Sequence, residues 1–226
     1  MDLFNDAFDA TLNLLPCDGT VNYFGQIMSD ACADFYFNEL QHNIAWQHDQ
    51  VQIAGQLITT ERQVAWYGDT AFAYTYSGTT KHALPWTETL LALKQCIEHI
   101  THAHFNSCLL NRYANGQQGM AWHSDDETSL GRNTCIASLS LGAQRTFAFK
   151  HKTTAKTITL ELAHGSLLLM KDQTQHHWLH RLPPRANIHQ ARISLTFRTM
   201  KDCKSFDTNL SKMPIKTAQS TPQLDF

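Results

Sequence analysis

The chain has 226 residues, a formal net charge of −2 and a hydrophobic fraction of 42%, which a single domain with a sizeable buried core accounts for. It has no apolar run of the roughly 20 residues that a membrane-spanning helix needs, and residues 1–10 are acidic and lack the apolar core of a signal peptide. We therefore expect a cytoplasmic protein that does not enter a membrane.

The charge is divided unevenly along the chain. Residues 1–100 carry 3 Lys and Arg and 12 Asp and Glu, a net charge of −9, whereas residues 101–200 carry 11 and 5, a net charge of +6. A polyanionic partner would meet the second half first. For a single basic residue such as Lys150, the simpler interpretation is a solvated strand end.

Two helices are predicted in the first half of the chain. Ser29 and Asp30 are typical of a helix start, and this helix is expected to run to about Asn43. Thr87 is a second candidate N-cap, and the apolar residues at positions 90, 93, 97 and 100 are spaced for one buried face of a helix that ends near His102.

Short strands are predicted around and after these helices. Residues 51–60 are expected to form a hairpin centred on Gly55, and residues 63–67 and 72–77 two short strands. Eight further strands are predicted at residues 105–113, 120–124, 134–141, 145–151, 157–162, 166–170, 176–181 and 191–199. Many short strands with turns between them indicate a sandwich or jelly roll of mainly β (α+β) class, with the helices packed outside.

This pattern suggests three parts of the chain. Residues 1–50 are expected to form an N-terminal helical extension packed on the core. Residues 51–200 would contain the hairpin and the catalytic core. Residues 201–226 lack hydrophobic periodicity and are rich in Ser, Thr and Lys, so we expect a mobile tail.

A candidate metal site lies in the sequence AWHSDDETSL at residues 121–130. His123 and Asp125 are two residues apart, and in an extended strand such residues point to the same face. For a third ligand His180 is preferred, because it precedes the Arg-Leu-Pro-Pro run that ends its strand; His176 would share its face, and His177 would point the other way. Two histidines and one carboxylate form the facial triad of non-heme Fe(II) oxygenases, which leaves an open face.

Taken alone, a His-x-Asp triplet is a weak signal, and in a chain with 13 His any one of them is more often a surface or core residue. The neighbouring strands add support. Alternation in the predicted last strand puts residues 192, 194, 196 and 198 on one face. A position at the end of an exposed strand is a plausible alternative for either Arg192 or Arg198 alone. It is a poor explanation for both, because they alternate with the apolar residues Ile193, Leu195 and Phe197.

Six segments together resemble the AlkB family of Fe(II)- and 2-oxoglutarate-dependent dioxygenases, which repair alkylated nucleobases. They are NRY at 111–113, WHSDDE at 122–127, ASLSLG at 137–142, HGSLLLM at 164–170, RLP after His180, and RISLTFR at 192–198. The resemblance covers about residues 51–200. It implies a double-stranded β-helix (jelly roll) and the cofactors Fe(II), 2-oxoglutarate and O2.

The resemblance also assigns residues to the cosubstrate. Arg192, assisted by Tyr113, would bind the distal carboxylate of 2-oxoglutarate, because a bidentate guanidinium is the strongest partner for it. Arg198 would hold the carboxylate nearer the iron, with Asn111 and Thr196 nearby. Ser194 departs from the family, which usually has Asn there, so we expect one weakened contact.

The implied substrates are N1-methyladenine and N3-methylcytosine in DNA, with RNA left open, demethylated with release of formaldehyde and succinate. These bases are positively charged, so aromatic rings and carboxylates favour them. The family's pattern places base contacts at Tyr74, Tyr76, Ser77 and Asp126. Glu127, beside Asp126, and Arg62, which would hold the backbone, complete the expected substrate contacts. Without the resemblance, Tyr74 and Tyr76 would be interpreted as core residues.

Two other functions compete with this interpretation. A dioxygenase of the same fold acting on a protein or a small molecule would keep the ligands and arginines but would not need Asp126 or the two tyrosines. A catalytically silent β-barrel binding module would have no reason to retain all three ligands. We expect a monomer that binds nucleic acid.

The resemblance makes one further prediction, about strandedness. Family members that repair duplex DNA carry a bulky aromatic wedge at the tip of the hairpin corresponding to residues 51–57, where an inserted side chain offsets unstacking. Here the tip reads Gln52-Ile53-Ala54-Gly55. We therefore predict a preference for single-stranded lesions, with Arg62 and the basic half of the chain holding the backbone.

Overall fold

The computed structural model describes residues 9–53, 56–76 and 79–201, and of residues 51–53, 74–76 and 79–81 it describes the backbone. The expected tail, apart from Lys201, and the tip of the predicted hairpin lie outside the described residues. Among the residues it describes, no helix is long and apolar enough to cross a membrane.

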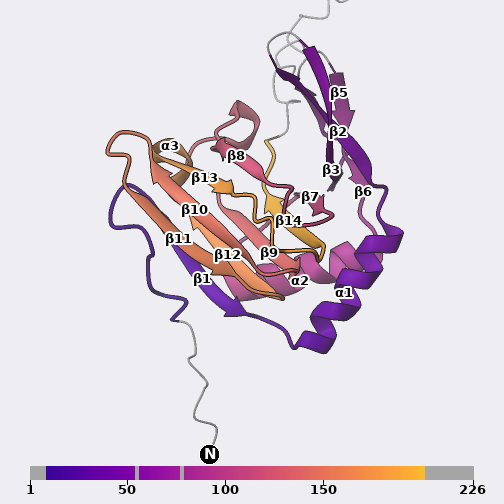
Figure 1. The fold of residues 1–226 in the computed structure, drawn as a ribbon, viewed down its shortest axis with the longest axis horizontal. Helices are drawn as coiled ribbons and strands as arrows, with labels where there is room; N and C mark the ends of the chain where they lie inside the picture. The colour runs from indigo at the N-terminus through magenta and orange to yellow at the C-terminus, as the bar shows by residue number, and fades with distance from the viewer. Residues whose placement is uncertain (1–8, 54–55, 77–78, 202–226) are drawn as a thin grey trace, which may run out of the picture.

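Two antiparallel sheets face each other and form the body of the molecule (Figure 1). The larger sheet has the order β1-β12-β9-β14-β7-β3-β2, and β6 pairs in parallel with β3. Its strands are β1 (Thr20–Gln26), β2 (Gln47–Ile53), β3 (Gln56–Gly68), β6 (Leu84–Pro85), β7 (Ser107–Tyr113), β9 (Ile136–Gly142), β12 (Ser166–Lys171) and β14 (Arg192–Arg198). The smaller sheet has the order β11-β10-β13-β8 and consists of β8 (Met120–His123), β10 (Arg145–His151), β11 (Thr157–Leu162) and β13 (Trp178–Leu182).

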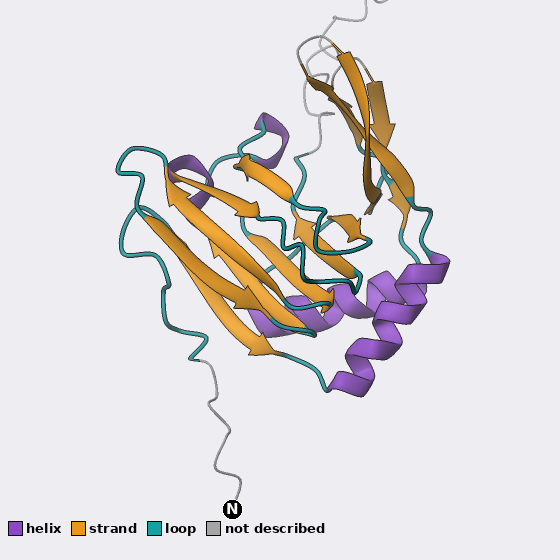
Figure 2. Cartoon of the chain, viewed as in Figure 1, coloured by secondary structure: helices purple, strands orange, loops and turns teal. Residues whose placement is uncertain are grey.

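Both predicted helices are confirmed, with their caps. In α1 (Asp30–Asn43) the Ser29 side chain accepts a hydrogen bond from the backbone of Cys32, and in α2 (Glu88–Thr101) the Thr87 side chain accepts one from Leu90. Figure 2 shows both helices on one side of the sandwich. They bury apolar residues against the outer face of the larger sheet, in a cluster that includes Leu40, Leu93, Leu139 and Leu195.

A second apolar cluster fills part of the space between the two sheets. It joins residues of β1, β9 and β12 to residues of β10, β11 and β13, including Val21, Ile136, Leu168, Phe149 and Trp178. On the other side of the same interior, β7, β9 and β14 contribute buried polar side chains instead. The interior is therefore apolar toward β1 and β11 and polar toward β7, β8 and β14.

The predicted hairpin is present as β2 and β3, whose register pairs Ile53 with Gln56. Its second strand is longer than expected, because β3 absorbs the predicted strand at 63–67 and continues along β7. Beside it, β4 (Ala73–Tyr76) pairs with β5 (Thr79–His82) in a separate two-stranded sheet. Together these strands project from the sandwich (Figure 1).

Two elements differ from the sequence-based expectation. A purely helical extension at residues 1–50 is wrong, because β1 is a strand of the larger sheet paired with β12. Its alternation is disguised by a register shift between Tyr23 and Gly25, where Gly25 has a positive φ of 66°. The strand predicted at 176–181 starts later, at Trp178, because residues Thr174–His177 form the short helix α3. The Thr174 hydroxyl lies within hydrogen-bonding distance of the carbonyl oxygens of Lys171, at 2.6 Å, and Thr20, at 3.1 Å.

Candidate metal centre and cosubstrate site

The three predicted metal ligands converge in the polar part of the interior. His123 ends β8, Asp125 follows two residues later, and His180 lies directly opposite His123 on β13. One nitrogen or oxygen atom from each side chain lies within 4.8 Å of the other two. The expectation that His176 shares the face of His180 is wrong, because His176 lies in α3 and not in the strand.

Hydrogen bonding and packing orient the two imidazoles. Nδ1 of His123 lies 2.8 Å from the carbonyl oxygen of Ala121 and donates to it, which leaves Nε2, 3.8 Å from Oδ1 of Asp125, with a free lone pair. The rings of His123 and His180 meet edge-on at 4.2 Å. Burial, and then the neighbouring His123, lower the pKa of His180 to about 3. A neutral imidazole is the form that ligates metals.

Asp125 is held from two directions. Its backbone N–H donates to Oε1 of Gln175 at 2.9 Å, and its Oδ2 accepts from Nη2 of Arg198 at 2.6 Å. Burial alone would raise the pKa of Asp125, but the charge of Arg198 and its hydrogen bond to the carboxylate outweigh it, so the pKa lies below its usual value. The carboxylate is therefore ionised and fixed in direction, as a metal ligand should be.

Gln175 is a site residue that the sequence did not reveal. It is buried, and its amide nitrogen also lies 3.5 Å from the sulfur of Met170. A glutamine among polar residues gives no local signal of burial. Only the α3 turn, which brings it back over the loop after β8, places it against Asp125.

The alternation predicted for the last strand is confirmed. In β14 the register sets Arg192 opposite Tyr113 and Ser194 opposite Asn111, so these polar residues share the inner face. Thr196 follows on the same face. The larger sheet therefore presents a polar row toward the metal ligands on the smaller one.

Arg192 is a buried cation without a matching anion among the described residues. It is 2% exposed, its Nη2 donates to the Ser140 hydroxyl at 2.8 Å, and its guanidinium lies 5.7 Å from the centre of the Tyr113 ring. Burial lowers its pKa to about 10. Burying an unpaired charge is costly, so this part of the interior is suited to an anionic ligand.

Several buried polar atoms around this interior also lack a hydrogen-bond partner among the described residues. They are Oδ1 of Asn111, Nδ1 of His180, and Nε of Arg192 and of Arg198. Native interiors leave few such atoms unsatisfied. Their clustering along β7, β13 and β14 fits a site built to receive polar groups from outside the chain.

Comparisons with known proteins agree with this geometry. The model of the 2OG-Fe(II) oxygenase superfamily matches residues 20–198. The DNA oxidative demethylase ALKBH2 of Bos taurus is 38% identical over 195 residues, covering 81% of this chain and 68% of that protein. The alpha-ketoglutarate-dependent dioxygenase alkB homolog 3 of Bos taurus is 40% identical over 178 residues, covering 74% and 62%. The chain belongs to the AlkB family of 2OG-Fe(II) oxygenases.

The solved structure of OsALKBH1 has the same fold, with a TM-score of 0.56 at 14% identity over 82% of this chain and 98% of that one. The predicted jelly roll is thereby confirmed. As a member of this family the protein is a dioxygenase that depends on Fe(II), 2-oxoglutarate and O2. The donor set found here, two imidazoles and one carboxylate, suits Fe(II).

The structure describes only part of the predicted substrate contacts. Asp126 is exposed and its Oδ2 lies 3.4 Å from Nζ of Lys152, whereas Oε2 of Glu127 is buried without a described partner. Burial and the nearby Asp125 raise the pKa of Glu127. Arg62 on β3 pairs with Asp49 at 2.5 Å and donates to the sulfur of Met120.

The aromatic part of the expected substrate site is only partly described. Tyr74 and Tyr76 belong to β4, but their side chains lie outside the described residues, as does Ser77. Arg62 connects the hairpin to the start of β8, because Met120 is the first residue of that strand. The hairpin is therefore fixed beside the strand that carries His123.

Proposed function

We propose that this enzyme removes methyl groups oxidatively from nucleobases in nucleic acid, with N1-methyladenine and N3-methylcytosine in DNA as the main substrates and RNA left open. The observation that carries this proposal is the 38% identity, over 81% of the chain, to a protein named DNA oxidative demethylase. The convergence of His123, Asp125 and His180 beside the unpaired Arg192 supports it.

In this proposal the two sheets have separate tasks. His123, Asp125 and His180 would hold Fe(II). Arg192 would bind the distal carboxylate of 2-oxoglutarate, with the Tyr113 hydroxyl. The remaining cosubstrate contacts would come from the inner faces of β7 and β14, at Asn111, Ser194, Thr196 and Arg198.

The proposed role of Arg198 has two components. It would hold the carboxylate of 2-oxoglutarate nearer the metal, and through its 2.6 Å contact it already orients Asp125. Ser194 lies within 3.5 Å of both the Arg192 guanidinium and the Ser138 hydroxyl. A serine there is shorter than the family's usual asparagine, so we propose that it leaves one cosubstrate contact weaker.

A cationic methylated base would be selected by charge and by stacking. Asp126, which is exposed, would provide negative charge near the base, and Glu127 beside it would add a second carboxyl group, whose Oε2 is buried without a hydrogen-bond partner among the described residues. The ring of His123 would form one wall, because its side chain remains 35% exposed. Tyr74, Tyr76 and Ser77 would form the other, and Arg62 would hold the backbone.

The chemistry would follow from these positions. When bound, Fe(II), 2-oxoglutarate and O2 supply the oxidising power that hydroxylates the N-methyl carbon, and the resulting hemiaminal breaks down to formaldehyde and the repaired base. The chain supplies ligands, orientation and exclusion of water. The buried Phe149 and the half-buried Phe147, packed 6.3 and 5.5 Å from the His180 ring, keep that side of the site apolar.

Formaldehyde release tests this proposal. With Fe(II), ascorbate and 2-oxoglutarate, we expect equal amounts of formaldehyde and succinate from an oligonucleotide that carries one N3-methylcytosine, and none above background from the unmethylated control. Succinate without formaldehyde would contradict it and would favour the rival, a dioxygenase of the same fold acting on a protein or small molecule. That the enzyme is a cytoplasmic monomer, with residues 51–200 as its catalytic part, stays a prediction.

A further inference from the structure

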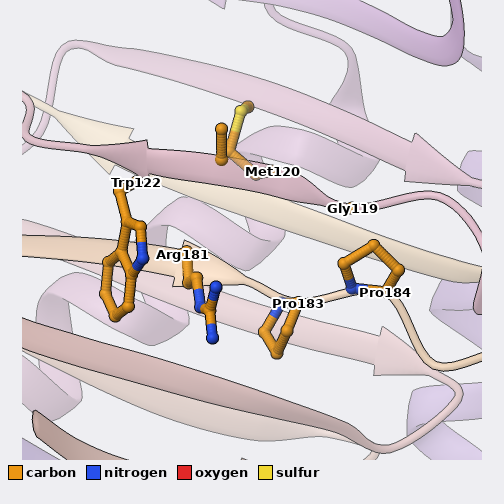
Figure 3. A pocket seen from close by; sticks show the side chains of 7 residues that line it. Gly119, Met120, Trp122, Arg181, Pro183 and Pro184 are labelled. Atoms are coloured by element: carbon orange, nitrogen blue, oxygen red, sulfur yellow. The ribbon is translucent and has the colours of Figure 1, made fainter.

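A pocket of about 370 Å³ opens on the face of the smaller sheet that points away from the metal centre. Neighbouring residues of a strand point to opposite faces, so Trp122 and Arg181 point outward while His123 and His180 point inward. Figure 3 shows Trp122, Arg181 and Pro183 directed to the same side of the two strands, whereas Met120 points to the other side. No residue of this pocket belongs to the cosubstrate or metal sites.

Inside the pocket a cation is stacked on an aromatic ring. The Cζ atom of Arg181 lies 4.5 Å from the centre of the Trp122 ring. No ion pair of Arg181 with a described residue is present, and its buried Nε has no hydrogen-bond partner among them. The guanidinium is therefore held in place by stacking, with its charge not neutralised by the described part of the chain.

A second pair of this kind, on the helical side of the molecule, provides a contrast. Nζ of Lys94 lies 5.3 Å from the centre of the Trp86 ring, but this lysine also pairs with Asp69 at 3.2 Å, and the Trp86 indole donates to the same carboxylate at 2.6 Å. That pair carries its own anion. The pair on the smaller sheet has no anion among the described residues, so its guanidinium is available to an anionic ligand.

The position of the pocket indicates which anion. It lies on β8, the edge strand of the smaller sheet, directly behind His123. A nucleic-acid chain that delivers one base to the metal site would reach the pocket by passing around the β8 edge of the sheet. Aromatic rings that stack on bases, combined with arginines that meet the phosphates, are how proteins bind single strands.

We propose that the pocket of Trp122 and Arg181 binds a nucleotide two or more positions away from the methylated one on the same strand, with its base stacked on the aromatic and proline surface and its phosphate on the guanidinium. This inference rests on the proposed function, because it assumes a nucleic-acid substrate. It adds a contact outside the active site, which a short substrate would not reach.

The test compares Arg181→Gln and Trp122→Leu with the wild-type enzyme on a methylated trinucleotide and on a longer methylated single strand. For the longer strand we expect both variants to weaken binding roughly 5- to 10-fold, since stacking and phosphate contacts are each of that order. Arg181→Gln should also reduce the slope of log Kd against log salt by about 0.7, the loss of one phosphate contact. The kcat/KM for the trinucleotide should not change.

Lys94→Gln is the matched control, since it removes a lysine stacked on tryptophan elsewhere, and it should bind both substrates like the wild type. Trp122→Phe should recover most of the binding that Trp122→Leu loses. Equal losses on the two substrates would show that the substitutions act through His123 and would overturn the proposal. Unchanged affinity and salt slope for the longer strand would also overturn it and would leave the pocket to another anion, such as an acidic peptide.

The two proposals can fail separately. Absence of formaldehyde release from every methylated substrate by the wild-type enzyme would defeat the proposed demethylation. If binding of the longer strand still depended on Arg181 in that case, the pocket would stand as a nucleic-acid site.

Discussion

Both faces of β14 are largely buried, yet they have different tasks. Ile193, Leu195 and Phe197 are all 0% exposed and belong to the apolar cluster beneath the two helices. Arg192 and Ser194, which alternate with them, are 2% and 7% exposed and face the metal ligands across the interior. Burial alone therefore does not separate stability from binding in this fold. The difference lies in whether the buried atoms are satisfied within the chain.

On the helical face the three side chains pack in an apolar cluster of the protein itself, so their stabilisation does not depend on a ligand. On the inner face, Nε of Arg192 and Oδ1 of Asn111 have no partner among the described residues. A buried polar atom without a partner costs about 1–3 kcal/mol. A ligand that partners these atoms would therefore stabilise the inner face further, and substitutions on the two faces should separate folding from binding.

The largest effect is expected at the metal ligands. Asp125→Ala should abolish both turnover and Mn(II) binding measured by calorimetry, because it removes one of three ligands from a site that the packed sheets otherwise support. Circular dichroism should show an intact fold. Asp126→Ala is the control: this neighbouring carboxylate is exposed and should not be needed for Mn(II) binding. Full activity of Asp125→Ala with added Fe(II) would remove Asp125 from the site.

The next effect concerns the buried cation. Arg192→Met should raise the KM for 2-oxoglutarate roughly 10- to 150-fold, because a charge-assisted hydrogen bond contributes about 1.5–3 kcal/mol. Steady-state kinetics with 2-oxoglutarate as the varied substrate measures it. Arg192→Lys should lose less, since it keeps the charge but not the bidentate geometry. An unchanged KM would mean that another residue binds the distal carboxylate.

A smaller effect is expected from the residue that positions Asp125. Gln175→Leu removes the acceptor of the Asp125 backbone N–H and should weaken Mn(II) binding roughly 10-fold, the lower end of what outer contacts of metal ligands contribute. Gln175→Glu keeps an acceptor oxygen and should retain most of the affinity. If both variants bind Mn(II) like the wild type, the hydrogen bond does not orient the ligand.

The smallest effect concerns strandedness, and it rests on the sequence of the hairpin tip, which lies outside the described residues. The tip lacks the aromatic wedge of duplex-repairing relatives, so repair of N3-methylcytosine should be faster in a single strand than in a matched duplex. Ala54→Phe should narrow that difference by filling the gap that the flipped base leaves. The ratio of the two initial rates measures it, and duplex repair as fast as single-strand repair would refute the idea.

Local patterns in the sequence were sufficient for the parts of the site that share one strand or one short segment. The spacing of His123 and Asp125 and the alternation along β14 predicted which side chains would meet, because both depend only on the geometry of an extended chain. The two helices were predicted from their N-cap residues and, for the second, from apolar spacing, which are also local features of the sequence. The ligand residues alone did not indicate a particular family. The six motifs and their order along the chain did.

Contacts between distant segments could not be predicted in this way. The ion pair of Arg198 with Asp125 joins residues 73 positions apart, and no local pattern indicates which of several arginines reaches a given carboxylate. β1 was missed because Gly25 interrupts its alternation. The α3 turn was interpreted as strand, because the hydrogen bonds of the Thr174 hydroxyl that accompany it depend on the fold.

The most direct test of the division along β14 is thermal unfolding of Arg192→Met and Leu195→Ala, each loaded with Mn(II), with and without 2-oxoglutarate. Leu195→Ala should lower Tm by roughly 5 to 15 °C, from a cost of about 2–5 kcal/mol, yet keep the rise in Tm that 2-oxoglutarate causes in the wild type. Arg192→Met should keep the Tm of the ligand-free protein and lose that rise. The reverse outcome, a ligand-dependent rise retained in Arg192→Met and lost in Leu195→Ala, would contradict the account.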